Sequence, residues 1–583
     1  MNYINRFSAT EKVIFGLLVV IATVTALAMA DGINSFFMIE IPSNNGKLTE
    51  GLVGLPHTIN PILAVTDVDR DISALVYSGL TTYKDGAFIP DLAASSTISS
   101  DGLTYSFTLK SGLHFQDGTP LTTDDVAYTI QKIQDAALKS PLRADWKDVT
   151  VKVISPTVIQ LTLKQPYSPF ISNTTVGIIP KHIWSALNDD QFVLSQYNIE
   201  PIGSGPYKES SIGKTNGIPD SYSLSAWSDY YDQHPYISSM TFKFYADQEK
   251  ALSALDSGSI DSLPSISAVD AARLAARLSS NTAASYRTIA APLPRVFGVF
   301  FNQNQSPVLA DKNVRMALNM VVDRNAIIKS ALNGYGKAVS GPLPFSVSGV
   351  ATPDLNAGLD LSLKTTSSTS AATSLLAAQN LLEKNGWVKD PTTKIYGLSK
   401  KGVKTIQTLS FDIYTANTPD LKQAAEMVRK SWTDLGALVT VKVFEPSDLY
   451  QNIISTRKYD ALLFGEFIGS DRDLFAFWHS SERNSPGLNV ALYTNSKVDK
   501  LLESIRNTTN DSTRQSQYLQ FSQLIAADLP AIFLYMPDFI YAVPKSLHGI
   551  DLGTIALPSD RFNSIADWYD TTERVWKIFA HNQ

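Results

Sequence analysis

The chain has 583 residues, a formal net charge of −6 at pH 7, a pI near 5.7 and no cysteine. Its length exceeds what one hydrophobic core organises, so we expect two or three domains, and its 44% hydrophobic and 18% charged residues are typical of a globular protein. The composition excludes disulfide, zinc-thiolate, iron–sulfur and cysteine-nucleophile chemistry, and the lack of a Lys and Arg cluster excludes nucleic acid as a partner.

The N-terminus has the features of an export segment. Arg6 and Lys12 precede an uncharged run over residues 13–30, which as a helix would be roughly 27 Å long, close to a bilayer core. Because basic residues precede the run and no comparable run follows, we expect the body outside the cytoplasm. The sequence AMA at 28–30 also fits a signal cleavage site. We expect an uncleaved membrane anchor, since the run is long for a signal peptide and no cysteine is available for lipid attachment; cleaved secretion is the alternative.

Residues 47–245 predict mainly strands and turns with short helices. In the stretch 101–130, DGLTYSFTLKSGLHFQDGTPLTTDDVAYTI, two Asp-Gly turns accompany an alternating strand over 103–109 and a second short strand over 113–115. Residues 149–163 predict a hairpin, because apolar residues alternate on both sides of a Ser-Pro turn.

The same stretch contains a carboxylate pair, Asp124 and Asp125, directly after Thr122 and Thr123. A threonine hydroxyl can cap the free N–H groups of a helix, and the helix dipole favours acidic side chains in the first turn. The pair therefore predicts a helix start rather than a catalytic dyad.

Helical spacing of apolar residues becomes common after Asp247, and strands lie between the helices, which argues for an α/β lobe. A Ser/Thr-rich segment over 356–374 predicts a loop. The expected helices cover 248–258, 268–280, 311–332 with a break at Asp323-Arg324, 373–387, 420–436, 496–507 and 514–530, and the expected strands cover 404–415, 437–445 and 459–467.

No catalytic or cofactor motif is present. The seven histidines have no metal-binding spacing, and the chain lacks a G-x-S-x-G elbow, a Walker loop and a dinucleotide fingerprint. The G-S-G of residues 201–207 is flanked by prolines, which argues against phosphate binding. Asp471 and Asp473 are a candidate carboxylate pair for catalysis, but no catalytic motif accompanies them, so we expect neither an enzyme nor a cofactor.

Aromatic and polar residues gather instead near predicted strand ends. Residues 464–481, FGEFIGSDRDLFAFWHSS, combine a strand, a glycine-containing turn, paired carboxylates and several rings, which is the composition of a ligand cleft. The candidate binding residues are Phe301, Asn302, Phe464, Glu466, Phe467, Asp471, Asp473 and Trp478.

Eight segments in chain order carry a family resemblance. Residues 101–126 match a strand reading D-G-x-x-Y-x-F-x-L followed by F-x-D-G-x-P-x-T-x-x-D-V. On these segments the chain resembles the extracytoplasmic solute-binding proteins of family 5, the peptide-binding components of ABC importers, along nearly its whole length after the N-terminus. The other matching segments are TINPIL, PIGSGPYK, FFNQNQSPVLADKNVRMALNMVVDR, GPLP, LLEKNGW, LYTNSKVDKLL and LPAIFLY.

The resemblance implies an α/β, two-lobe periplasmic-binding-protein-like fold of type II, with an extra subdomain and with mixed sheets joined by a strand hinge. Residues 1–46 would form the signal or anchor helix and linker. Lobe I would comprise 47–80, 199–293 and 541–583, its extra subdomain 81–198, and lobe II 294–540. A ligand that binds the closed state better would shift the population of lobe arrangements toward it.

The resemblance also implies binding residues. In peptide-binding relatives the segment before Gly79-Leu80 lines the cavity. An aspartate in a G-W-x-x-D-x-x-D-P-x-x-F segment holds the peptide α-amino group. Aligning the second aspartate with Asp473 puts Ser470 at the amine-binding position, with Asp471 as the candidate substitute, while Glu466 replaces the usual tryptophan. The positions matching the cavity segment are Asp67, Asp69, Arg70 and Asp71.

The implied function is non-catalytic capture of an oligopeptide or similar small solute and its delivery to an ABC permease, by a protein expected to be monomeric. The same scaffold could bind a nickel chelate, haem or an oligosaccharide, because a chelated metal needs few protein ligands and an aromatic cleft suits sugar. A membrane-anchored chaperone or sensor that holds peptides is a further alternative.

Overall fold

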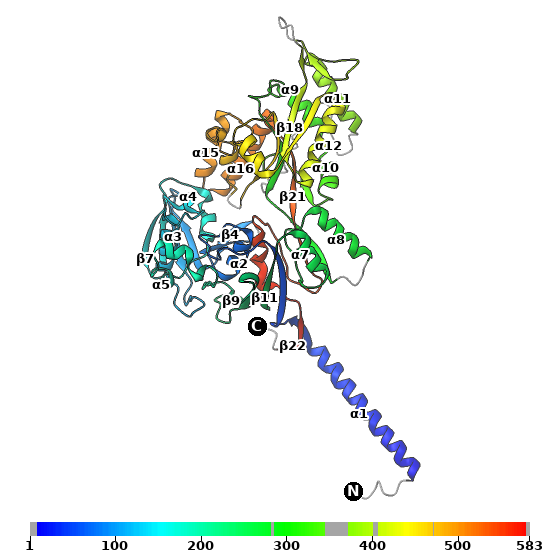
Figure 1. Cartoon of the computed structure of the whole chain (residues 1–583). Coiled ribbons are helices and arrows are strands. Elements are labelled where there is room, and N and C mark those ends of the chain that lie inside the picture. The colour runs from blue at the N-terminus through cyan, green and yellow to red at the C-terminus, as the bar shows by residue number, and fades with distance from the viewer. Residues whose placement is uncertain are drawn as a thin grey trace.

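The computed structural model describes residues 8–84, 86–280, 285–343, 371–399, 406–469 and 472–578. Figure 1 shows a two-lobed body from which one long helix projects. Helices and strands alternate in both lobes, so the predicted mixed α/β fold with an N-terminal apolar helix is confirmed. The domain limits expected from the sequence stay a prediction.

The projecting helix is α1 (Ala9–Phe37), whose segment Thr10–Met29 is long and apolar enough to cross a membrane and has no buried residues. It continues directly into β1 (Met38–Pro42), which pairs antiparallel with β22 (Thr572–Trp576) near the other end of the chain. The Phe37 ring stacks on Trp576 at 6.3 Å between ring centroids. The helix is therefore attached to the body through a two-stranded ribbon.

Lobe I is built on a four-stranded sheet ordered β2-β11-β10-β9. Parallel β2 and β11 join residues nearly 200 positions apart, and helix α2 (Asp67–Val76) packs near the C-terminal segment. The core of this lobe draws on residues 48–293 and 539–568. The elements of this part are β2 (Gly46–Val53), η3 (Gln196–Asn198), β9 (Tyr207–Thr215), β10 (Ile218–Ala226), β11 (Ile237–Tyr245), α7 (Gln248–Asp256), α8 (Ala268–Ser280) and η6 (Pro558–Asp567).

A second four-stranded sheet, ordered β5-β6-β8-β7, contains the stretch 101–130. The predicted strand is β6 (Thr104–Leu109), and the predicted hairpin is β7 (Thr150–Ser155) with β8 (Val158–Thr162). The other elements here are β3 (Thr81–Lys84), β4 (Ala87–Pro90), β5 (Ala93–Ile98), α4 (Arg143–Trp146), η2 (Ser168–Thr175), α5 (Lys181–Trp184) and α6 (Asp189–Leu194).

Helix α3 (Thr123–Gln134) begins as its sequence predicts. The Thr122 hydroxyl accepts the Asp124 N–H, and the Asp125 carboxylate accepts the Thr122 N–H in return. The expected second strand over 113–115 is wrong: His114 forms only an isolated bridge with Pro120. Leu113 and Phe115 are buried, so their alternation marks two packed side chains in a loop rather than a strand.

Lobe II contains a seven-stranded sheet ordered β12-β21-β13-β20-β18-β19, with β14 also paired to β21. The expected helices of this region form, and the helical stretch over 311–332 breaks before Arg324 as predicted. The expected strands over 437–445 and 459–467 also form, whereas the strand expected over 404–415 is divided into β17 and β18 and its residues 404 and 405 lie outside the described residues. The predicted loop over 356–374 lies outside the described residues up to 370, and its last four residues begin α11. The strands are β12 (Tyr286–Pro292), β13 (Arg295–Phe301), β14 (Gly336–Ala338), β15 (Trp387–Lys389), β16 (Tyr396–Leu398), β17 (Gln407–Thr408), β18 (Ser410–Ala416), β19 (Leu438–Phe444), β20 (Ala461–Phe467) and β21 (Ala531–Pro544). The helices are α9 (Lys312–Met320), α10 (Arg324–Ala331), α11 (Ala371–Lys384), α12 (Pro419–Leu435), α13 (Pro446–Asp448), η4 (Leu449–Ile454), α14 (Phe475–Trp478), η5 (Ser480–Arg483), α15 (Ser496–Asn507) and α16 (Asp511–Asp528).

Strand β21 joins the two lobes. Its first half, over 531–535, pairs with β13 and belongs to the core of lobe II, whereas 539, 541 and 543 belong to the core of lobe I. Between these halves the Pro537 carbonyl accepts the Leu293 N–H at 2.9 Å, at the connection between β12 and β13. The strand connection between the lobes therefore consists of β21 beside the β12–β13 crossover (Figure 1).

Candidate functional site

Helix α2 carries the charged residues that the sequence places before Gly79. The Asp69 carboxylate is 1% exposed and accepts the backbone N–H groups of His57 at 2.7 Å and Thr58 at 3.0 Å. It thereby ties the preceding loop to the helix N-terminus. Arg70 and Asp67 form an exposed ion pair at 3.2 Å on the outer face of the helix.

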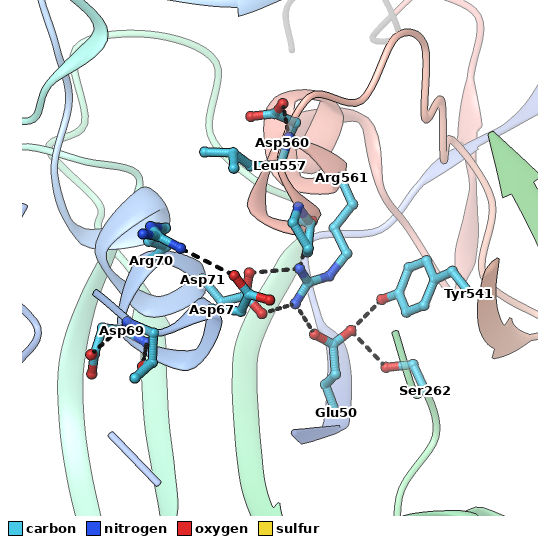
Figure 2. Close-up of polar contacts among 12 residues, drawn as sticks. Glu50, Asp67, Asp69, Arg70, Asp71, Ser262, Tyr541, Leu557, Asp560 and Arg561 are labelled. Atoms are coloured by element: carbon cyan, nitrogen blue, oxygen red, sulfur yellow. Dashed lines mark hydrogen bonds and ion pairs between the residues drawn. The ribbon is translucent and has the colours of Figure 1, made fainter. Parts of the chain in front are cut away.

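Asp71, one turn after Asp67 on the same helix, enters a buried ionic network (Figure 2). The Arg561 guanidinium donates two hydrogen bonds of 2.8 Å to Asp71 and one of 2.5 Å to Glu50. Glu50 also accepts hydrogen bonds from the Tyr541 hydroxyl and, at 3.1 Å, from the Ser262 hydroxyl. Burial raises the pKa of Asp71 to about 6, although Arg561 acts in the opposite sense. The network joins five residues that come from β2, α2, the segment around residue 262, β21 and η6.

Phe301 and Asn302 lie at the end of β13 that is far from the hinge. The Phe301 ring is fully buried and contacts Trp432 at 6.2 Å between ring centroids. The Asn302 amide donates to the Arg457 carbonyl at 2.9 Å, and its side-chain oxygen accepts the Gln305 N–H at 3.1 Å. The Phe301 side chain is therefore part of the core, and the Asn302 side chain is hydrogen-bonded within the turn that follows β13.

Strand β20 has a free edge near the hinge. On one side it pairs with β13 along its whole length, but on the other side β18 reaches only Ala461 and Leu462. The Ile468 N–H donates to the Pro294 carbonyl on the β13 side. Because backbone groups of alternate residues point to the same edge, Gly465 and Phe467 direct their N–H and C=O groups away from β13. In the described part of the chain no strand pairs with them there.

The side chains of β20 divide between its two faces. Phe464 and Glu466 line a cavity of about 80 Å³, which we name the Glu466 pocket, whereas Phe467 lies on the other face with the Arg295 guanidinium 5.4 Å from its ring centre. The Glu466 pocket is also lined by Tyr450, Ile454, Ser455, Arg457, Phe477, Ser485, Pro486, Gly487, Leu488 and Val490.

Glu466 is an unusual wall residue because its carboxyl group is 2% exposed, and neither oxygen has a hydrogen-bond partner among the described residues. Burial raises its pKa well above the ordinary glutamate value, and an interaction with the Trp478 indole acts in the opposite sense. Trp478 is itself fully buried, with its ring 6.2 Å from Phe300 and 5.9 Å from Phe533.

Asp473 connects the lobes, while Ser470 and Asp471 lie outside the described residues. Arg506 donates to both Asp473 oxygens, at 2.6 to 3.1 Å, and the Tyr167 hydroxyl of the extra subdomain donates to the same carboxylate at 3.1 Å. Asp473 therefore lies at a contact between the two lobes, with Arg506 as its ion-pair partner.

The structure brings Phe464, Glu466 and Phe467 together on β20 and places Asp473 a short loop beyond them. It leaves Asp69, Arg70 and Asp71 in lobe I, and Phe301 and Asn302 at the distal end of β13. The sequence predicted none of the partners Arg561, Arg506 and Tyr167. They lie 33 to 490 positions from the residues they contact, and no local pattern marks them.

A separate cavity of about 470 Å³ lies in lobe I between the end of α2, the β3–β4 hairpin and the C-terminal segment. Its lining includes Asp91, Asp560 and Tyr230, and burial raises the pKa of both carboxyls to about 6. None of the binding residues expected from the sequence lines it. Within the described ranges, no group of three or more His, Asp or Glu side chains is placed to hold a metal ion.

Comparison with known proteins finds a matching family model and several similar proteins. Residues 87–486 match the model of bacterial extracellular solute-binding proteins, family 5 Middle. The oligopeptide-binding protein AppA of Bacillus subtilis is 26% identical over 520 residues, covering 87% of this chain and 89% of the relative. The nickel-binding periplasmic protein of Escherichia coli is 27% identical over 527 residues, covering 88% and 90%.

Among solved structures, the ABC transporter substrate-binding protein CtaP of Listeria monocytogenes superposes with a TM-score of 0.72 at 28% sequence identity. The superposition covers 90% of this chain and 99% of that one. The agreement therefore extends over both lobes and the extra subdomain.

Proposed function

Because the chain belongs to the bacterial extracellular solute-binding proteins of family 5, which are transport components of ABC importers binding peptides or related solutes, we propose that it captures oligopeptides by closure of its lobes and delivers them to an ABC permease. No catalysis is involved. Closure requires only that the peptide binds the closed arrangement better than the open one.

The free edge of β20 is the observation that carries the proposal. Toward the edge beside the hinge, Gly465 and Phe467 direct N–H and C=O groups that no described strand pairs, and an extended peptide can add a strand to the sheet there. Main-chain hydrogen bonds of this kind supply affinity without depending on the peptide sequence, and pockets on the two faces of the sheet add preference for particular side chains. The similarity to an oligopeptide-binding protein supports peptides as the ligand class.

Candidate ligand residues follow from the same placement. Phe464, Glu466 and Phe467 lie at the β20 edge, and Ser470 and Asp471 continue from it in sequence. We assign Asp471 as the partner of the peptide ammonium group. In this proposal helix α2 is held in place by Asp69 and Asp71, whose carboxylates bind other protein groups. These two residues, with Arg70 beside them, would affect the ligand by positioning the helix.

The first test is mass spectrometry of small molecules released by denaturing the purified full-length chain. We expect a series of peptides, whose length distribution would define the cavity. A single sugar, haem or nickel chelate would overturn the peptide assignment, and the nickel-binding relative makes the chelate a necessary comparison.

A matched pair of variants tests the strand edge itself. Phe467→Pro removes the outward N–H together with the ring, whereas Phe467→Ala removes the ring alone; proline is tolerated at an edge where the N–H does not pair within the sheet. We expect Phe467→Pro to bind an extended peptide about 3- to 10-fold more weakly than Phe467→Ala in calorimetric titrations, the value of one hydrogen bond. Equal affinities, with both variants folded by thermal melting, would refute capture along this edge.

We also propose that α1 remains as a membrane anchor and that the protein acts as a monomer. The helix continues without a break into β1, whose pairing with β22 holds the body close to the end of the Thr10–Met29 span. The intact mass of protein from isolated membranes should include residues 1–30. A mature form that begins at Asp31 would contradict the anchor, and light scattering in detergent tests the monomer.

A further inference from the structure

The Glu466 pocket combines an apolar wall with a buried acid that has no ion-pair partner among the described residues. Phe464, Phe477, Ile454 and Leu488 give the pocket its apolar lining. The Glu466 carboxyl is 2% exposed, and neither of its oxygens accepts a hydrogen bond from any described residue. The Trp478 indole is the described group that interacts with this carboxyl, and it carries no charge. Burial without a cation is unfavourable for the ionised form, so a cation brought by a ligand would stabilise the carboxylate.

Arg457 is the basic residue in the wall of the pocket, and its guanidinium already binds backbone carbonyls. Its guanidinium donates hydrogen bonds to the carbonyls of Arg483 at 2.9 Å, Ile454 at 3.2 Å and Gly487 at 2.5 Å. No ion pair between Arg457 and Glu466 occurs in the described structure, and Arg457 is not among the groups that shift the pKa of Glu466. Arg457 therefore shapes the pocket without neutralising the acid.

The pocket lies where a side chain of a bound peptide would enter. Glu466 and Phe464 are two positions apart on β20, so they share one face of the strand. A peptide that pairs with the free edge next to Gly465 and Phe467 directs alternate side chains to that face. One of these side chains would lie beside Glu466, and a cavity of about 80 Å³ has room for a group of a few heavy atoms.

We propose that the Glu466 pocket is a subsite for a basic side chain with an aliphatic stem and an ammonium tip, as in lysine. This inference rests on the proposed capture of peptides along β20. The apolar wall would cover the methylene stem, and Glu466 would accept a charge-assisted hydrogen bond from the ammonium group. An all-apolar side chain would fill the same space but would leave the carboxyl without a partner.

Binding of the ammonium group would ionise Glu466. Burial raises the pKa of the free carboxyl well above its ordinary value, so part of the population is protonated before binding. A cation beside the group stabilises the carboxylate and lowers that pKa again. Capture of a lysine side chain would therefore release a proton, whereas capture of an uncharged side chain of the same length would not.

The test uses the full-length chain and two series of five-residue alanine peptides. One series carries lysine at each position in turn, and the other carries norleucine, which has a similar length and no charge. We expect one position at which lysine binds about tenfold or more tightly than norleucine, as one charge-assisted hydrogen bond provides. Titrations in buffers of different ionisation enthalpy should show proton release for that lysine peptide alone.

Two variants separate the pocket from general charge effects. Glu466→Gln should reduce the lysine-to-norleucine ratio to about one and abolish the proton release. Glu426→Gln, which removes an exposed carboxylate on α12 that pairs with Arg429, should keep the wild-type ratio. If Glu466→Gln fails to fold, the proton-release measurement on the wild-type chain still decides the question.

The outcomes distinguish this inference from the proposed function. Peptide binding without a lysine preference at any position would overturn the subsite and leave peptide capture standing. A lysine preference that persists in Glu466→Gln would likewise overturn it. If no peptide of either series binds, both the capture of peptides and the subsite that depends on it fail.

Discussion

At the scale of single residues, the stability of the buried ionic network in lobe I depends on Arg561, which pairs with two carboxylates. Its side chain is fully buried between Asp71 and Glu50, so Arg561→Gln would leave two carboxylates buried without a cation. Removing one partner of a buried ion pair typically costs about 3–5 kcal/mol. We expect a loss of this size in the free energy of unfolding, measured with urea.

Arg70→Gln is the matched control for this prediction, because Arg70 makes an exposed ion pair with Asp67 on the same helix as Asp71. Exposed pairs of this type contribute less than about 1 kcal/mol. If both variants lost a similar amount of unfolding free energy, the loss would come from removing any arginine charge and not from the buried network.

Asp91 gives the stability of lobe I a dependence on pH. Burial raises its pKa from the ordinary 3.8 to about 6 in the folded state, against the opposing effects of the Tyr231 hydroxyl and Lys110. Between pH 4 and 6 the folded state therefore binds more protons than the unfolded state, so the free energy of unfolding falls as the pH rises. The stabilisation that the protonated Asp91 provides is lost as the pH rises through about 6, and between pH 4 and 6 the loss is on the order of 2 kcal/mol.

The variant Asp91→Asn isolates this effect, since an amide oxygen can still accept the Tyr231 hydroxyl but does not titrate. Its unfolding free energy should fall less than that of the wild type between pH 4 and 6. Asp434→Asn, which removes an exposed carboxylate of lobe II that pairs with Lys430, should follow the wild-type curve. Parallel curves for Asp91→Asn and the wild type would show that Asp91 is not the source.

At the scale of elements, the turn over 201–207 depends on a close approach of two backbones. A Cβ atom added to Gly203 would overlap the carbonyl oxygen of Val76 at the end of α2. Because the obstacle is main chain rather than a flexible side chain, Gly203→Ala should cost about 3 kcal/mol of unfolding free energy. Gly334→Ala meets no atom within 4 Å but has φ +89°, so it should cost only about 1 kcal/mol. Equal costs would refute the close approach.

Local elements could be predicted from the sequence because their causes are local. The Thr122 cap with Asp125, the hairpin over 149–163 and the break before Arg324 each depend on residues within a few positions. The expected strand over 113–115 is wrong because alternation of two buried side chains does not by itself supply a pairing partner. Pairing depends on distant chain, as the parallel contact of β2 with β11 illustrates.

The candidate site could be predicted only in part for the same reason. Residues 464–467 were recognised from their composition, and the structure places them at a free strand edge beside the hinge. Asp71 was expected in the cavity, yet its engagement by Arg561 could not be foreseen, because 490 positions separate them. Asp473 shows the same limit, since Tyr167 lies 306 positions away. Contacts between lobes follow from the whole fold.

At the scale of the whole molecule, hydrogen bonds of side chains join the extra subdomain and the adjoining hairpin to lobe II, and the described residues include three of them. The Tyr167 hydroxyl donates to Asp473 at 3.1 Å, the Ser168 hydroxyl donates to the Ile505 carbonyl at 3.2 Å, and Arg472 donates to the Gly86 carbonyl at 3.4 Å. All three would break if the lobes moved apart. In the proposed capture by lobe closure, these contacts would stabilise the arrangement in which the lobes touch, even without a ligand.

Tyr167→Phe tests this contribution, because it removes one hydrogen bond to a carboxylate and keeps the ring that lies 5.7 Å from the Arg506 guanidinium. The ligand would then have to stabilise closure by itself, so we expect peptide affinity to fall by about 3- to 10-fold. The radius of gyration of the unliganded protein should rise in X-ray scattering, while that of the peptide complex should not. Tyr414→Phe removes a hydroxyl that interacts with Lys442 within lobe II, and it should change neither quantity. An unchanged affinity and radius in Tyr167→Phe would mean that the hinge strands alone determine the balance between open and closed lobes.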